Sequence, residues 1–83
     1  MASVRLSDSA LQDLERLDSV ISERIVAKLL WLEENFTSVV PGYLHRNLSG
    51  LYKLRIGDYR AVYSVRNDII VIEQVGHRRD VYR

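Results

Sequence analysis

The chain has 83 residues, of which 47% are hydrophobic and 28% charged, with no cysteine and a formal net charge of +1 at pH 7. A chain this short supports one hydrophobic core, its apolar content argues against disorder, and the absence of cysteine excludes disulfides and thiolate metal sites. It holds neither a signal-peptide pattern nor the roughly 18 consecutive apolar residues of a membrane span. We therefore expect one domain over residues 1–83 of a soluble, cytoplasmic protein with no membrane partner.

The chain begins with a predicted strand and a predicted helix. Val4 and Leu6 alternate with polar residues, which indicates a short strand. Ser7 fits a helix N-cap, because its side chain can accept from an unpaired backbone N–H of the first turn. Apolar residues then recur at helical spacing, which predicts an amphipathic helix over residues 8–17.

A second helix and a long loop follow. Asp18 or Ser19 caps this helix, whose apolar stripe runs to about Asn35. The connection to the first helix is short, so we expect an antiparallel helical hairpin. Residues 36–50 hold the only proline and two of the four glycines, which predicts a crossing loop.

The second half of the chain predicts three strands joined by tight turns, because its apolar residues change to a period of two. Gly57-Asp58 fits a two-residue hairpin turn with glycine first, and Asn67-Asp68 marks a second turn. The strands are residues 51–56, 59–65 and 69–75, the last closed by Gly76. The predicted fold class is α+β: an N-terminal strand, a helical hairpin and a three-stranded antiparallel meander, with the helices packed on one sheet face.

Positive charge is concentrated in the second half of the chain. Residues 1–43 hold four Lys or Arg and seven acids, whereas residues 44–83 hold eight Lys or Arg and four acids. This asymmetry favours a polyanionic partner for the second half.

The strand pattern gathers three cations on one sheet face. Tyr52, Leu54 and Ile56 alternate with Lys53 and Arg55, and the tight turn should place Arg60 beside these two. Like charges so close repel each other, and a bound phosphate would turn that repulsion into attraction.

The C-terminal run should add further groups next to this face. If Gly76 ends the last strand, His77, Arg78, Arg79 and Tyr82 emerge beside the three cations. Such a set suits RNA cleavage without a metal, in which a 2′-OH loses a proton, the phosphorane charge is stabilised and the leaving oxygen gains a proton. Arginine does not act as a base, so Lys53, His77 or Tyr82 would supply that function. No metal-ligand or nucleotide-binding motif occurs in the sequence, and we expect neither a metal nor another cofactor.

These segments resemble a known family. The runs LSGLYKLRIGDYRAVYSV (residues 48–65) and VGHRRDVYR (residues 75–83), together with SDSALQDLERLD and WLEEN in the first half, are similar to the RelE/ParE superfamily of bacterial toxins, on the RelE side. The resemblance implies a microbial-RNase-like toxin domain that enters the ribosomal A site, cleaves translated mRNA by 2′-OH attack and so inhibits translation.

The resemblance also implies roles for individual residues. Arg60 and Arg78 would stabilise the phosphate and leaving group, Lys53 would act as or assist the base, and Tyr82 would orient or stack on a nucleobase. Arg55 stands where some RelE toxins have a second lysine, so that position cannot supply a base here. The implied catalytic set is Lys53, Arg55, Arg60, Arg78 and Tyr82; His77 and Arg79 are candidates for catalysis or RNA binding, and Arg46, Arg66 and Arg83 for RNA binding.

The implied partners are a cognate antitoxin and a ribosome carrying mRNA, with contacts to 16S rRNA. Two other functions stay open. A ParE-like toxin would inhibit DNA gyrase without cleaving RNA, although such relatives generally lack the full set of basic residues and tyrosine. A plain RNA-binding module would explain the cations but not the close spacing of Arg78 and Tyr82.

Overall fold

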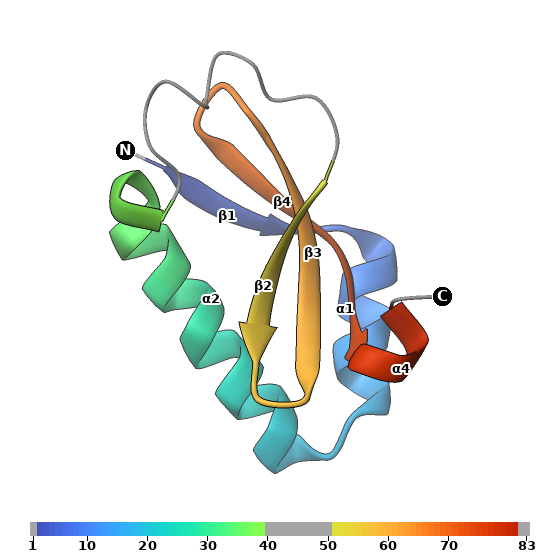
Figure 1. Ribbon diagram of the computed structural model, residues 1–83. Coiled ribbons are helices and arrows are strands. Elements are labelled where there is room, and N and C mark those ends of the chain that lie inside the picture. Colours follow the sequence, from blue (N-terminus) through green and yellow to red (C-terminus); the bar gives the residue numbers. More distant parts are fainter. Residues whose placement is uncertain (1, 40–50, 82–83) are drawn as a thin grey trace.

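The computed structural model describes residues 2–39 and 51–81. In these two ranges, two helices lie behind a twisted four-stranded sheet, and the short helix α4 (Arg78–Val81) follows the last strand (Figure 1). The elements in chain order are β1 (Ser3–Leu6), α1 (Asp8–Arg16), α2 (Ser19–Val39), β2 (Tyr52–Ile56), β3 (Tyr59–Arg66), β4 (Ile69–His77) and α4 (Arg78–Val81). The α+β class and the predicted order of strand, helical pair and three-stranded meander are confirmed. No helix in these two described ranges combines the length and apolarity needed to cross a membrane.

The sheet has the strand order β1-β4-β3-β2. β2, β3 and β4 form the antiparallel meander, whereas β1 pairs in parallel with β4 from Ser3 opposite Ile69 to Leu6 opposite Ile72. The outer edge of β1 is covered in part by α2, because Val4 N donates to Glu33 Oε2 at 2.7 Å. This contact occupies a donor that an exposed edge strand would otherwise offer to another chain.

The helix boundaries follow side-chain caps. Ser7 Oγ accepts from Ala10 N at 3.0 Å, which confirms the predicted cap of α1. For α2, Asp18 is the residue whose side chain caps the helix, since its Oδ1 accepts from Val20 N at 3.3 Å. The two helices run in opposite directions along the sheet (Figure 1).

The predicted end of the second helix was wrong. α2 continues to Val39, although Asn35 has a non-helical conformation (φ −113°, ψ 19°) and its side chain donates to Trp31 O at 2.9 Å. The next residue, Phe36, is only 2% exposed and packs in the core, so its burial stabilises a further turn beyond the kink. The predicted loop therefore begins after Val39, and residues 40–50 lie outside the described residues.

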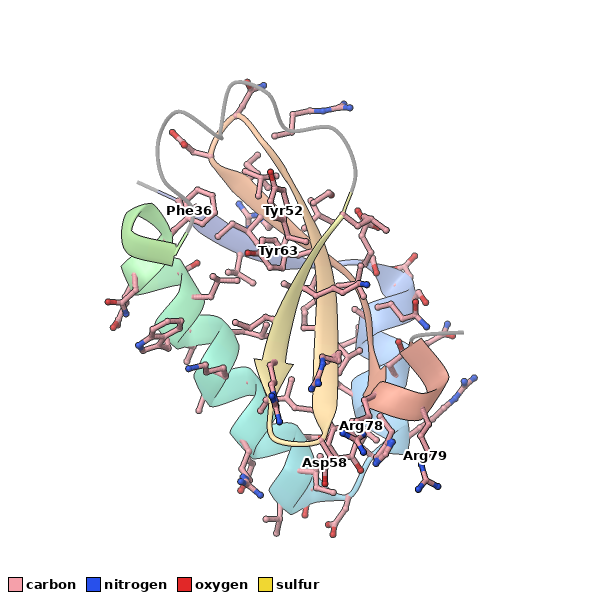
Figure 2. All side chains as sticks on the ribbon, viewed as in Figure 1. Phe36, Tyr52, Asp58, Tyr63, Arg78 and Arg79 are labelled. Carbon is pink, nitrogen blue, oxygen red and sulfur yellow. The ribbon has the colours of Figure 1, made fainter. Side chains whose placement is uncertain are left out.

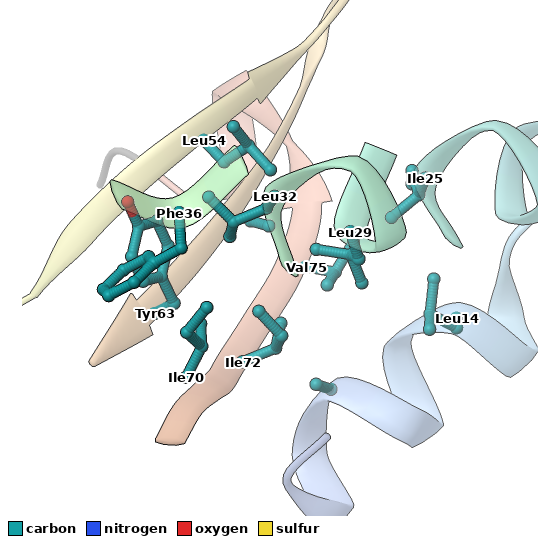
Figure 3. Packing of buried hydrophobic residues seen from close by; sticks show 12 residues of the cluster. Leu14, Ile25, Leu29, Leu32, Phe36, Leu54, Tyr63, Ile70, Ile72 and Val75 are labelled. Carbon is teal, nitrogen blue, oxygen red and sulfur yellow. The ribbon is translucent and has the colours of Figure 1, made fainter. Parts of the chain in front are cut away.

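The core lies between the sheet and the two long helices (Figure 3). Alternate strand residues face it, as the period of two predicted, and Tyr52 stacks on Tyr63 with ring centroids 5.6 Å apart. Its large members are Leu14, Ile25, Leu29, Leu32 and Phe36 from the helices, and Leu54, Tyr63, Ile70, Ile72 and Val75 from the strands.

β4 is longer than predicted, because Gly76 does not close it. Gly76 and His77 pair with β3, and a register shift lies between Val62 and Tyr63. Beyond the end of β1, side chains of α1 and its cap bond to the outer edge of β4: Ser7 Oγ donates to Glu73 O at 3.0 Å, and Val75 N donates to Asp13 Oδ2 at 2.9 Å. These bonds satisfy backbone groups that would otherwise lack a partner strand, so the strand can continue.

We predict that Asp13→Ala destabilises the protein by about 1.5–3 kcal/mol, the usual contribution of a hydrogen bond to a charged group. Glu15→Ala, a change at an exposed acid on the same helix, is the matched control and should stay within about 0.5 kcal/mol of wild type. Urea denaturation measures both. If the two variants lost the same free energy of unfolding, the effect would come from helix composition, and the bond from Val75 N to Asp13 would not contribute to stability.

We also predict an alkaline loss of stability from Tyr63. Burial raises the pKa of Tyr63 above the usual 10.0, and the charge of Tyr52 raises it further. The unfolded chain therefore ionises this phenol at lower pH than the folded chain, so its contribution to stability is complete below about pH 10 and declines as the pH rises toward the folded-state pKa. Denaturation at a series of pH values should show a smaller decline above pH 10 in Tyr63→Phe than in wild type.

Candidate functional site

The turn between β2 and β3 sets the register of the candidate site. Gly57 has φ +60°, a conformation that glycine adopts readily and that the first position of this kind of turn requires. The turn places Ile56 opposite Tyr59 and Arg55 opposite Arg60. Directly opposite residues lie on the same sheet face with Cα atoms about 4.5–5.5 Å apart, so Arg55 and Arg60 are neighbours.

Within the described strands, five cations share the sheet face opposite α1 and α2, which we call the basic face. The pairing of Arg55 with Arg60 and of Lys53 with Val62 puts the three predicted strand cations on this face. The chemical roles of these residues stay predictions. The basic face carries Arg5, Lys53, Arg55, Arg60 and Arg66.

Arg55 and Arg60 converge on one backbone oxygen. Arg55 Nε donates to Gly57 O at 3.4 Å, and Arg60 Nη1 donates to the same oxygen at 3.2 Å. Arg60 Nη1 also donates to Tyr59 O at 3.0 Å, and this side chain is only 9% exposed, whereas Arg55 is exposed. Arg60 therefore holds the turn as well as contributing charge beside it.

The C-terminal segment is bonded to the same turn. Arg78 N donates to Asp58 O at 2.8 Å as α4 begins. Figure 2 shows the Arg78 side chain beside Asp58 at the end of the β2–β3 hairpin. Arg78 and Arg79 are both exposed. The structure thus brings Arg55, Arg60 and Arg78 together around Gly57-Asp58, as the charge pattern indicated.

His77 does not join the basic face, and the prediction that it emerges there was wrong. It is the last residue of β4 and pairs with Tyr59, on the face that α1 and α2 cover. Its ring meets the Tyr59 ring edge-on, at a centroid distance of 5.4 Å and an interplanar angle of 79°. The cause is the continuation of β4 through Gly76, since each added strand residue points to the opposite face.

The remaining predicted residues lie farther away or outside the described part. Arg66 is on the basic face but six residues along β3 from Arg60, which is about 20 Å in a strand. Tyr82, Arg83 and Arg46 lie outside the described residues.

Two charged residues of the basic face were missed from the sequence. Arg5 of β1 pairs with Val71, and Glu73 of β4 accepts a hydrogen bond from Ser64 Oγ at 2.8 Å. The alternation of Ser3 and Arg5 with Val4 and Leu6 already indicated the face of Arg5, but not that β1 joins the meander. Within residues 2–39 and 51–81, no three His, Asp or Glu side chains gather as a metal site would require.

Comparison with known proteins decides the family. The model of the family described as "ParE toxin of type II toxin-antitoxin system, parDE" matches residues 4–82. The chain belongs to this toxin family, within the RelE/ParE superfamily. Among RelE/ParE proteins, it is 31% identical over 83 residues to Toxin RelG of Mycobacterium tuberculosis, a match that covers 98% of this chain and 95% of RelG.

Solved RelE/ParE structures share the fold. The M. tuberculosis toxin–antitoxin complex RelBE2 contains a chain 29% identical to this one, with a TM-score of 0.62 and coverage of 93% of this chain and 98% of that one. The isolated Escherichia coli RelE toxin has a TM-score of 0.69 at 23% identity, covering 93% of this chain and 84% of that one, and this similarity concerns the fold alone.

For this RelE/ParE toxin we predict that Arg60→Ala lowers the free energy of unfolding by about 1–3 kcal/mol, because two backbone carbonyls lose a buried charged donor. Arg55→Ala removes an exposed side chain with one long hydrogen bond and should change stability by no more than about 0.5 kcal/mol. Thermal and urea unfolding compare the two. A stable Arg60→Ala variant would show that these bonds do not hold the turn.

Proposed function

We propose that this toxin is a ribosome-dependent endoribonuclease that cleaves translated mRNA in the A site by metal-independent attack of the 2′-OH, and so inhibits translation. The observation that carries the proposal is the convergence of Arg55, Arg60 and Arg78 on the Gly57-Asp58 turn. Two guanidinium groups bonded to Gly57 O, with the Arg78 side chain beside Asp58, suit a phosphate whose negative charge grows during the reaction.

The three tasks of the reaction divide among different residues. Arg60 and Arg78 stabilise the phosphorane and the leaving oxygen, with Arg55 as a further anion ligand. Arginine does not deprotonate, so the proton of the 2′-OH goes to another group. Lys53 lies on the same face, two residues from Arg55 along β2, and acts as or assists the base. His77 is left out of this scheme because it lies on the other side of the sheet.

The outer residues of the proposed site bind RNA. Tyr82 orients or stacks on a nucleobase, following its place in the family motif. Arg66 extends the positive charge along β3, away from the turn. Arg46, Arg79 and Arg83 are further proposed RNA ligands, and the ribosomal partner surface includes 16S rRNA.

A cognate antitoxin is the proposed protein partner. The M. tuberculosis RelBE2 structure and the RelB-RelE structure of Methanococcus jannaschii are both toxin–antitoxin complexes. An acidic antitoxin segment that covers the basic face would neutralise its cations and exclude RNA.

A ParE-like inhibitor of DNA gyrase is the alternative, because the matching family model is described as a ParE toxin. The three arginines at the turn favour the nuclease, since gyrase inhibition does not require a phosphorane-stabilising cluster. The two functions make opposite predictions for mRNA integrity and for DNA supercoiling.

We predict that the purified protein cleaves a reporter mRNA within codons in a purified translation system, and that Arg78→Ala and Lys53→Ala each reduce the cleavage rate by about 100-fold or more. Lys28→Ala removes a cation of α2 that lies over the Trp31 ring, outside the basic face, and should retain wild-type cleavage. The readout is mapping of 5′ ends together with the rate of loss of full-length mRNA. Arg60→Ala is unsuitable here, because its effect on the turn would be confused with chemistry.

Intact mRNA in the wild-type reaction, together with blocked supercoiling by gyrase, would overturn the nuclease proposal in favour of the ParE-like alternative. Cleavage that persists at wild-type rate in Arg78→Ala would remove α4 from the proposed site.

A further inference from the structure

His77 links the last strand to the helix that carries Arg78. It is the residue directly before α4, and its Nδ1 accepts from Arg79 N at 3.3 Å. A side-chain acceptor placed just before a helix and bonded to an N–H of its first turn is the geometry of an N-cap. The preceding N–H, that of Arg78, donates to Asp58 O. The first amide of α4 is therefore bonded to the hairpin turn, and the second is bonded to the His77 ring.

The His77 ring is itself positioned by its surroundings. It packs edge-on against Tyr59, its cross-strand partner, which in turn packs against the core. The ring also lines a pocket of about 290 Å³, and Asp13 and Arg16 of α1 line the same pocket. Because Nδ1 accepts a hydrogen bond, the proton of the neutral imidazole is on Nε2.

We propose that His77 is a positioning residue: as a neutral imidazole it caps α4 and so holds Arg78 at the Gly57-Asp58 turn beside Arg55 and Arg60. This inference rests on the proposed nuclease function for its effect on activity, but the cap itself is a property of the free protein. His77 touches no reacting atom in this scheme, since its ring lies on the sheet face opposite the arginines.

The cap has a built-in dependence on protonation. A protonated imidazole has two N–H donors and no acceptor, so it cannot bond to Arg79 N. The groups near the ring that bear on its charge are Asp13 and Arg16 from α1, which line the same pocket, Tyr59 from β3, and the adjacent Arg78 and Arg79 of α4. Acidification is expected to release the first turn of α4 and move Arg78 away from the turn.

The test compares His77→Asn with His77→Ala. Asparagine keeps a side-chain acceptor, is among the best N-cap residues and does not titrate, whereas alanine offers no acceptor. Hydrogen exchange at the Arg79 amide, measured by NMR on the free protein, should be about 2- to 30-fold faster in His77→Ala than in wild type, the factor that a lost cap gives. His77→Asn should restore the slower exchange. Gln74→Ala, a change at an uncharged residue that lines the same pocket, is the matched control and should leave the exchange unaltered.

The activity arm uses mRNA cleavage in the purified translation system between pH 5.5 and 8. His77→Ala should lower the cleavage rate by a similar factor, and His77→Asn should restore most of it. Wild-type cleavage should decline more on the acid side than cleavage by the Asn variant, because the amide oxygen stays an acceptor where a protonated imidazole does not.

Two results would overturn the inference. One is an Arg79 amide that exchanges equally fast in all variants, which would mean that the ring does not cap α4. The other is a His77→Asn variant with slow exchange and no cleavage, which would make His77 a chemical participant. If wild type cleaves no RNA, the nuclease proposal fails while the exchange data still decide whether His77 holds α4.

Discussion

The turn at Gly57-Asp58 is the constraint on which the proposed site depends. Its two-residue length fixes the register of β2 against β3, and a slip of one residue would move Lys53 and Arg55 to the face that packs against the helices. The same turn supplies the backbone oxygens that hold the basic groups: Gly57 O accepts from Arg55 and Arg60, and Asp58 O accepts from the amide of Arg78. Register, charge placement and attachment of the C-terminal segment therefore share one short element.

Local patterns were sufficient to predict most of the fold. The positive φ angles of Gly57, Asn67 and Asp68 match the two turns that glycine, asparagine and aspartate indicate, and a period of two identified the meander. The pairing of β1 with β4 could not be predicted, because alternation gives the face of a strand residue but not its neighbouring strand. The extension of α2 past Asn35 also depends on tertiary packing, since burial of Phe36 outweighs a local break in the helix.

Local patterns also predicted only part of the candidate site. Lys53, Arg55 and Arg60 were placed correctly on one face because a tight hairpin makes their proximity a local matter. His77 was misplaced because its face depends on how far β4 continues, and bonds from Ser7 and Asp13, more than 60 positions earlier in the chain, support that strand. The structural role of Arg60 was not predicted either, since a sequence does not show that this arginine is only 9% exposed and bonded to backbone carbonyls.

Holding arginines by backbone carbonyls has a consequence for anion binding. Two neighbouring guanidinium groups repel each other, and the shared Gly57 oxygen, the negative end of a peptide dipole, offsets part of that repulsion without neutralising either charge. A carboxylate in the same place would compete directly with a phosphate, whereas a carbonyl leaves the full positive charge of the pair. Because Arg55 uses Nε for this bond, its outer nitrogens make no hydrogen bond within the described residues and can form a bidentate contact with phosphate. The turn thus pre-organises the cations at a low electrostatic cost, so that a phosphate bound here would spend less of its binding energy on ordering them.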